Sequence, residues 1–163
     1  AVEFPTLSKS YSMAGWRLGF AVGNRAILAS LAKTKSYVDF GIFRAVQWAA
    51  IKALVGPQDC VTQTVEAYRK RRDAFVGGLQ RIGWDVPLPT STFYVWAKIP
   101  LKFSALTSLE FATVLMQEAG VVMAPGSGFG ECGEGYVRFA LVEPEATLRH
   151  AVTRMAKVLQ MED

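Results

Sequence analysis

Cysteine, histidine and long apolar runs are all scarce in this chain of 163 residues. Two cysteines, Cys60 and Cys132, cannot form the disulfide framework of a small secreted protein. With His150 as the single histidine, neither a zinc cluster nor a serine–histidine–carboxylate triad has its parts. No apolar run approaches the roughly 20 residues that a transmembrane helix requires. We therefore expect no bound metal, no membrane association and a cytoplasmic location.

The excess of positive charge is small. Lysine and arginine number 18 against 14 acidic residues, and the resulting net charge of +4 is well short of the balance typical of nucleic-acid-binding proteins. A basic run at residues 69–72 falls on a predicted amphipathic helix, where a solvated face is the simpler interpretation and a nucleic-acid contact the alternative. We predict no nucleic-acid partner.

Hydrophobic residues make up 51% of the chain, which is enough to bury a core, and they fall into short strand and helix patterns. The most distinct local signals are a cap at Asn24, a capping box from Thr107 to Glu110, and helix-ending glycines at Gly83 and Gly120. The patterns predict an α/β chain whose later part is an α+β unit with a small sheet covered by helices. Strands are expected at 2–7, 18–22, 93–99, 121–124 and 136–142, and helices at 25–37, 45–54, 61–82, 107–119 and from Pro144 onward.

The loop between the first two expected strands carries the residue types best suited to chemistry. Lys9 is flanked by hydroxyl residues between two apolar strands, where a hydrated ammonium is costly unless it is exposed, paired or covalently used. The Thr6 hydroxyl and the Arg17 guanidinium suit a phosphate, so Lys9 could condense with a phosphorylated aldehyde cofactor. On residue types alone, a hairpin-like turn with a solvated lysine stays open.

The run from Thr6 to Gly19, TLSKSYSMAGWRLG, resembles the lysine-attachment motif of the class I and II aminotransferases, which are pyridoxal-phosphate-dependent enzymes of fold type I. In that family the motif begins with a small hydroxyl residue, and the lysine comes three positions later. A variable stretch and then glycine-x-arginine-x-glycine follow. The resemblance implies that Lys9 is the covalent attachment site of pyridoxal 5'-phosphate and that Arg17 binds its phosphate. Thr6 stands where serine is more usual and keeps the hydroxyl.

The resemblance continues downstream in the same order. Residues 91–96 resemble the family's small-domain strand, with Ser91 where glycine is usual. Residues 125–130 and 135–140 resemble the loop and strand that deliver the arginine for the substrate α-carboxylate, which implies that role for Arg138. A planar guanidinium can hold a carboxylate through two parallel hydrogen bonds, although a surface or ion-paired arginine stays open without the family context. The spaced glycines of the loop lack the helix that follows a dinucleotide-binding fingerprint, and we expect a turn.

The match covers this whole chain but only the C-terminal portion of the family's members, and the chain begins at Ala1 without an initiator methionine. We therefore expect residues 1–57 to end a large cofactor-binding domain and residues 58–163 to form the small domain. The aspartate that pairs with the pyridinium nitrogen, the aromatic residue that stacks on the cofactor ring and the glycine-rich phosphate turn belong to the part not matched. We expect little activity from this portion alone.

The activity implied for the parent protein is exchange of an amino group between an amino acid and a 2-oxo acid by a ping-pong mechanism. The family is usually a homodimer. Two alternatives stay open. One is a non-catalytic interaction module derived from the fold, and the other is a different fold type I enzyme such as a lyase, decarboxylase or synthase.

Overall fold

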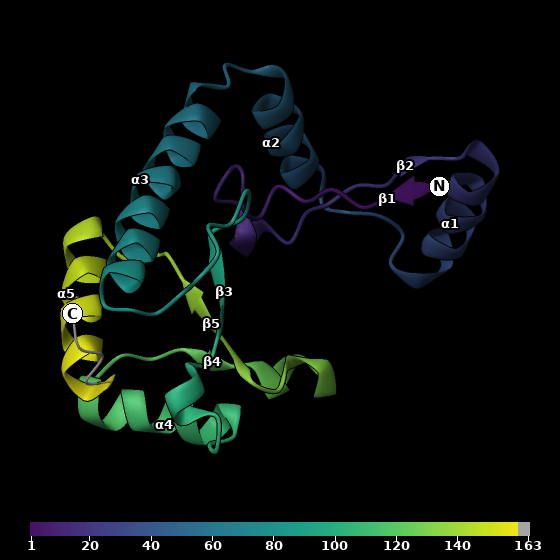
Figure 1. Ribbon diagram of the computed structural model, residues 1–163. Helices are drawn as coiled ribbons and strands as arrows, with labels where there is room; N and C mark the ends of the chain where they lie inside the picture. Colours follow the sequence, from purple (N-terminus) through teal and green to yellow (C-terminus); the bar gives the residue numbers. More distant parts are fainter. Residues whose placement is uncertain (160–163) are drawn as a thin grey trace. The chain divides into compact units, whose positions relative to one another are not determined.

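A computed structural model describes residues 1–159 and divides the chain into two compact units. Unit 1 comprises Ala1–Val65, and unit 2 begins at Glu66. The boundary falls inside the long helix α3 (Asp59–Arg81), which the sequence predicts at 61–82 (Figure 1). The sequence-based boundary after residue 57 concerns the domains of a longer enzyme and stays a prediction.

Unit 1 starts with an antiparallel hairpin. Strand β1 (Val2–Glu3) pairs with β2 (Val22–Gly23), and a single bridge between Thr6 and Gly19 continues the same register. The two strands are shorter than predicted because Pro5, between the paired positions, has no N–H to donate. Its carbonyl still accepts a hydrogen bond of 3.0 Å from the amide of Phe20.

Two helices follow the hairpin in unit 1. Helix α1 (Arg25–Val38) has the predicted cap, because the Asn24 side chain accepts hydrogen bonds from the amides of Ala26 and Ile27. Helix α2 (Arg44–Val55) ends at Gly56. Figure 1 shows both helices, and a small core forms where α2 packs against the hairpin. The fully buried members of that core are Leu7, Leu18 and Ala50.

Unit 2 contains a three-stranded antiparallel sheet in the order β3-β5-β4. The strands are β3 (Tyr94–Lys98), β4 (Ala124–Pro125) and β5 (Tyr136–Ala140). Because side chains alternate along a strand, the sheet has one apolar face and one face of aromatic and charged residues. The buried residues of the apolar face are Val95, Ala97, Val137 and Phe139, and the other face carries Tyr94, Trp96, Tyr136 and Arg138.

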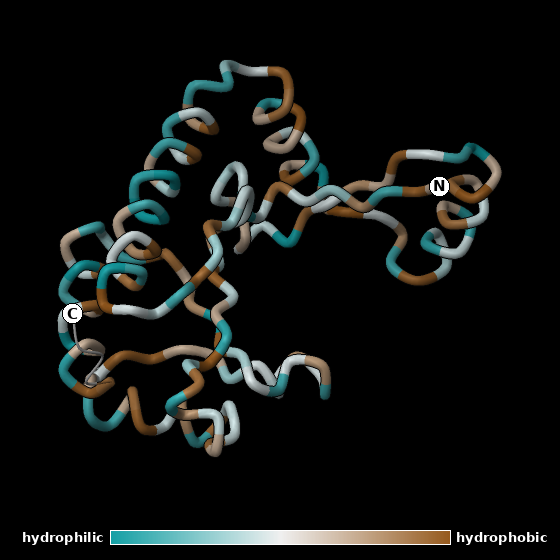
Figure 2. Tube along the Cα trace, in the orientation of Figure 1, coloured by the Kyte–Doolittle hydropathy of each residue, from teal (hydrophilic) through white to brown (hydrophobic). Residues whose placement is uncertain are grey.

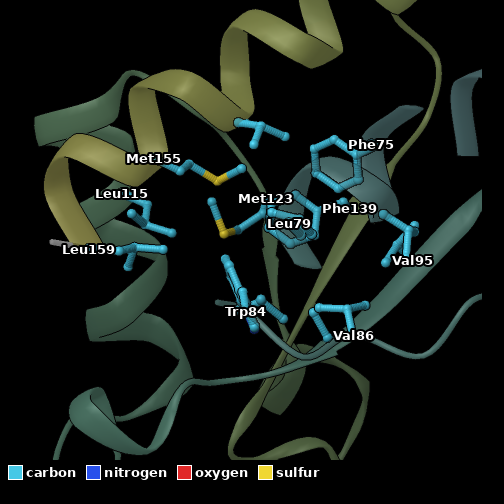
Figure 3. Close-up of a cluster of buried hydrophobic side chains, with 14 of the residues drawn as sticks. Phe75, Leu79, Trp84, Val86, Val95, Leu115, Met123, Phe139, Met155 and Leu159 are labelled. Atoms are coloured by element: carbon cyan, nitrogen blue, oxygen red, sulfur yellow. The ribbon is translucent and has the colours of Figure 1, made fainter. Parts of the chain in front are cut away.

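The core of unit 2 lies on the apolar face of the sheet, under α3, α4 (Ser108–Ala119) and α5 (Glu145–Leu159) (Figure 3). Trp84 is 1% exposed, and its indole N–H donates to the carbonyl of Lys98 at 2.8 Å. Helix α3 is mainly hydrophilic, with apolar residues at intervals, as Figure 2 shows. Its apolar positions supply Phe75, Val76 and Leu79 to this core.

The predicted strand at 121–124 is wrong over most of its length. Helix α4 begins with the predicted capping box and ends at Gly120, whose φ of 60° is left-handed. The amide of Val121 then donates to the carbonyl of Leu115 at 3.2 Å, which closes the last turn of the helix. Pairing with β5 starts only at Ala124, so β4 has two residues.

The basic run at residues 69–72 is only half solvated. Arg69 and Lys70 are exposed, as expected for a charged helix face. Arg71 instead donates to the carbonyls of Leu141 and Val142, at 3.2 and 3.1 Å, and Arg72 donates to a carbonyl in the loop before β3. Short 3₁₀ turns complete the structure at Ala14–Trp16, Leu101–Phe103, Gly126–Phe129 and Glu131–Gly133.

Candidate active site

The loop that carries Lys9 closes over a pair of buried leucines. The amide of Leu7 donates to the carbonyl of Leu18 at 3.4 Å, and the two residues are 1% and 8% exposed. Inside the loop, the carbonyl of Leu7 accepts hydrogen bonds from the amides of Tyr11 and Met13. These main-chain bonds fix the path of the loop, while Lys9 itself is exposed.

Thr6, the predicted hydroxyl residue of the motif, lies at the base of this loop. Its Oγ1 donates to the carbonyl of Leu18 at 3.1 Å, accepts from the amide of Ser8 at 3.2 Å and lies 2.9 Å from the Ser8 hydroxyl. The structure thus places Thr6 and Lys9 in one hydrogen-bonded turn. The sequence from Phe4 to Val38 contains no acidic residue, so the loop is locally positive.

Arg17 ends the 3₁₀ turn of the same loop in a left-handed conformation, with φ of 51°. Its amide and its Nη1 both donate to the carbonyl of Ala14, at 3.3 and 3.0 Å. A non-glycine residue in this region is uncommon, and here the second bond to the same carbonyl holds it. Only one of the five guanidinium donors is used in this bond, and the side chain is exposed.

Sequence inspection missed a side-chain link that holds the lysine loop. The Tyr11 hydroxyl donates to Oε1 of Gln58 at 2.7 Å, and the Gln58 amide group donates in turn to the carbonyls of Ala53 and Gly56. Tyr11 therefore ties the loop to the end of α2, within unit 1. No local pattern could reveal this pairing, because the two residues are 47 positions apart.

Arg138, the predicted carboxylate-binding residue, lies on the central strand of unit 2 with its guanidinium between two aromatic rings. The Cζ atom lies 4.1 Å from the ring centroid of Tyr94 and 4.3 Å from that of Phe129. The Nε atom is buried, and no acceptor within residues 1–159 takes its hydrogen bond. Its charge is stabilised by the faces of the two rings, and a buried donor without an acceptor remains.

The aromatic residues around Arg138 form a continuous layer on this face of the sheet. Trp96 stacks on Tyr136 with the centroids 5.6 Å apart and meets Phe129 edge to face at the same distance. A separate cavity of about 530 Å³, lined by none of these aromatic residues, has Arg138 in its wall together with residues of β4, β5 and α5. Most of that lining is apolar, and its charged residues are Arg138 and Glu143.

A polar network of the buried Ser108 and the exposed Glu134 lies beside this layer. The Glu134 carboxylate accepts hydrogen bonds from the amides of Ser108 and Gly135, at 2.6 and 3.0 Å, and from the hydroxyl of Ser108 at 3.0 Å. The backbone bond from Ser108 is the main cause that lowers the pKa of Glu134 below its ordinary value. Ser108 is fully buried at the first turn of α4, where a negative charge is favourable.

Thr6, Lys9 and Arg17 thus share one loop of unit 1, and Arg138 lies in unit 2. The sequence profile of the family described as aminotransferase class I and II matches residues 2–155. This chain belongs to that family. The membership inferred from the lysine motif is confirmed.

Named members of this aminotransferase family are close in sequence over almost the whole chain. The glutamate-pyruvate aminotransferase AlaC of Escherichia coli strain K12 is 53% identical over 152 residues, which are 93% of this chain and 37% of that protein. An LL-diaminopimelate aminotransferase of Syntrophobacter fumaroxidans is 52% identical over 157 residues, 96% of this chain and 40% of that protein. The chain therefore spans about two fifths of the length of these relatives.

Solved structures of aminotransferases share the fold. An aminotransferase from Staphylococcus aureus superimposes with a TM-score of 0.91 at 34% identity, over 100% of this chain and 43% of that one. The aromatic aminotransferase from Pyrococcus horikoshii gives a TM-score of 0.90 at 32% identity, over 98% of this chain and 43% of that one. The predicted fold class, a part of the α/β fold of these enzymes, is confirmed.

Residues 1–159 lack two features, a membrane-spanning helix and a cluster of metal ligands. None of the helices there has the length and apolar character needed to cross a bilayer. No group of three or more histidine, cysteine and acidic side chains in that range is arranged to hold a metal ion.

Proposed function

We propose that this chain is the C-terminal part of a pyridoxal-phosphate-dependent aminotransferase that moves an amino group between an amino acid and a 2-oxo acid in ping-pong order. The observation that carries the proposal is the buried Nε donor of Arg138, which no acceptor of the described chain satisfies. An unsatisfied buried donor is costly, and a substrate carboxylate would supply the acceptor. The other guanidinium N–H groups add the parallel bond of a bidentate grip.

The donor set of the lysine loop fits pyridoxal 5'-phosphate. The loop offers one primary amine at Lys9, the hydroxyl of Thr6 and the guanidinium of Arg17, with no acidic residue between Phe4 and Val38 to oppose an anion. Thr6 and Arg17 would hold the phosphate, and Lys9 would hold the aldehyde carbon. When bound, the cofactor supplies a carbonyl group that takes up the amino group and a ring that accepts electron density from the α-carbon.

Each of the chain's own residues has a proposed role in this reaction. Arg138 binds the α-carboxylate and so fixes the orientation of the α-carbon. The Nζ of Lys9 accepts the α-proton and later returns a proton, as a general base and acid. Arg17 neutralises the phosphate, and the hydrogen bonds of Thr6 and Tyr11 keep the loop in place. The relatives' names refer to glutamate, pyruvate and LL-diaminopimelate, all of which have a carboxylate that Arg138 could hold.

A cytoplasmic homodimer is the state we propose for the complete enzyme. Unit 1 supports an interface, because several of its large apolar side chains are exposed. These include Tyr37 at 79%, Phe40 at 93%, Phe43 at 75% and Trp48 at 64%. A surface of this kind is expected to be covered by other parts of the polypeptide or by a second subunit. Alone, the chain is proposed to be inactive, because the relatives contain more than twice its length.

Covalent labelling of the complete enzyme tests the proposal directly. The enzyme is incubated with pyridoxal 5'-phosphate, its absorbance is followed between about 330 and 430 nm, and the adduct is reduced with borohydride and mapped to a peptide. We expect the label on Lys9, its loss in Lys9→Arg, and its retention in the control Lys33→Arg. A label that survives in Lys9→Arg would refute the assignment. Transaminase activity, measured in parallel, separates this enzyme from a lyase or decarboxylase with the same attachment lysine.

A further inference from the structure

The 3₁₀ turn that carries Phe129 is held mainly at its base. Gly126 and Gly133 lie in backbone contact there, so close that a Cβ on Gly126 would be 1.9 Å from the carbonyl oxygen of Gly133. Beyond that contact the turn projects from the sheet, and Phe129 is 50% exposed. The position of the Phe129 ring over Arg138 therefore requires a further stabilising interaction within the turn.

Ser127 provides this interaction by contacting Ser108 of α4. The Ser127 amide donates to the hydroxyl oxygen of Ser108 at 3.2 Å, and the two hydroxyl oxygens are 3.0 Å apart. Since an ionised carboxylate can only accept, the single hydroxyl proton of Ser108 points to Glu134, and its lone pairs face Ser127. The carboxylate thus determines which way the Ser108 hydroxyl is oriented, and with it the bond to Ser127.

We propose that Glu134 is a positioning residue for the guanidinium of Arg138. It acts through Ser108 and Ser127, which hold the turn whose Phe129 ring lies 4.3 Å from the Cζ of that arginine. With Phe129 in place, the guanidinium is confined between two rings and presents one edge to a carboxylate. Without it, the guanidinium can turn and the two parallel hydrogen bonds lose their alignment. This inference rests on the carboxylate-binding role proposed above for Arg138.

Two tryptophans allow the inference to be tested. Their indole N–H signals are followed by ¹⁵N NMR of the isotope-labelled 163-residue chain. Trp96 contacts Phe129, so its indole N–H signal reports the position of the turn. Trp84 is buried in the core, so its signal reports whether unit 2 remains folded. The Nε–H signal of Arg138, assigned by its loss in Arg138→Lys, reports the guanidinium. The probe is sodium acetate, titrated against sodium chloride at equal ionic strength.

In the unmodified chain we expect acetate to shift the Arg138 signal to saturation. Glu134→Gln should move the Trp96 signal, leave the Trp84 signal in place and weaken acetate binding roughly three- to tenfold. The matched control is Glu131→Gln, which removes the same charge from a neighbouring exposed side chain. Within residues 1–159 that side chain has no hydrogen bond or ion pair, because only the Glu131 carbonyl is bonded, so the variant should change neither signal. If Glu134→Gln also displaces Trp84, the exposed Ser127→Ala variant repeats the test without removing a charge.

Unchanged Trp96 shifts and unchanged acetate affinity in Glu134→Gln would overturn the inference. A separate result would show that the proposed carboxylate-binding role of Arg138 is wrong. If acetate gives no saturable shift of the Arg138 signal in the unmodified chain, then Arg138 does not bind the carboxylate. In that case the Trp96 signal of Glu134→Gln still decides whether the glutamate holds the turn.

Discussion

Arg138 lies diagonally across the sheet from Tyr94, with its guanidinium carbon 4.1 Å from the ring centroid. The pairing register accounts for this contact, because Arg138 is directly opposite Trp96 and Tyr94 is two residues away on the same face. A diagonal neighbour of this kind is within reach of a long side chain. The contact holds the cation in place, and no acidic side chain within residues 1–159 pairs with it, so the edge proposed to bind a carboxylate stays available.

Replacing Tyr94 by leucine should weaken substrate binding in the complete enzyme. The variant removes an aromatic face worth about 1 kcal/mol to a cation, which corresponds to a roughly fivefold rise in KM for the amino acid. Tyr94→Phe keeps the ring and should stay near the original value. Steady-state kinetics with saturating 2-oxo acid measures both. Equal effects of the two variants would show that the hydroxyl, and not the ring, is responsible.

Adding a methyl group at Gly126 should destabilise the chain. The Cβ would lie 1.9 Å from the carbonyl oxygen of Gly133 and 2.6 Å from that of Tyr136, so the backbone has to move. We expect Gly126→Ala to lower the free energy of unfolding by about 2 kcal/mol or more, as measured by urea denaturation. Gly128→Ala is the matched control, because nothing lies within 4 Å of its Cβ position. That variant should stay within about 0.5 kcal/mol, and similar losses from both would contradict the close contact.

The capping box of α4 should make stability depend on pH in the acid range. Glu110 accepts a hydrogen bond from the amide of Thr107 at 2.8 Å, which lowers its pKa from the ordinary value of 4.5. A lowered pKa in the folded state means that the unfolded chain binds more protons, so stability rises with pH in this range. The contribution is complete above pH 4.5 and is lost as the pH falls through the lowered pKa.

Urea titrations of the chain and of Glu110→Gln, from neutral pH down to about 3, measure this dependence. The two proteins should differ most at neutral pH and converge at the acid end. Thr107→Ala, which removes the other half of the box, should cost about 1 kcal/mol at neutral pH. A constant difference between the chain and Glu110→Gln across the whole range would show that the carboxylate charge has no part in the cap.

Local signals in the sequence predicted the parts of the fold that depend on neighbouring residues. The Asn24 cap and the Thr107–Glu110 box are examples, since each satisfies amides only two or three positions away. The strand predicted at 121–124 failed because its apolar composition gave no sign that the Val121 amide would close the preceding helix. The apolar composition of residues 121–124 indicates only that their side chains suit a strand. The hydrogen-bond partner of the Val121 amide depends instead on how helix α4 ends.

The candidate site divides in the same way. Lys9, Thr6 and Arg17 could be picked from a continuous motif, and Arg138 from its resemblance to a known strand. The supporting residues could not. Glu134 meets Ser108 across 26 positions, and only the folded unit brings them together. Tertiary contacts of this length leave no periodic trace in the sequence.

Arg138 belongs to the strand that is paired on both sides, opposite Trp96 in β3 and Ala124 in β4. Main-chain amides in such a position are expected to exchange slowly with deuterium. The anchoring guanidinium is therefore attached to backbone with the rigidity of the entire sheet. Under the carboxylate-binding role proposed for Arg138, adaptation to substrates of different size would have to come from the surrounding loops.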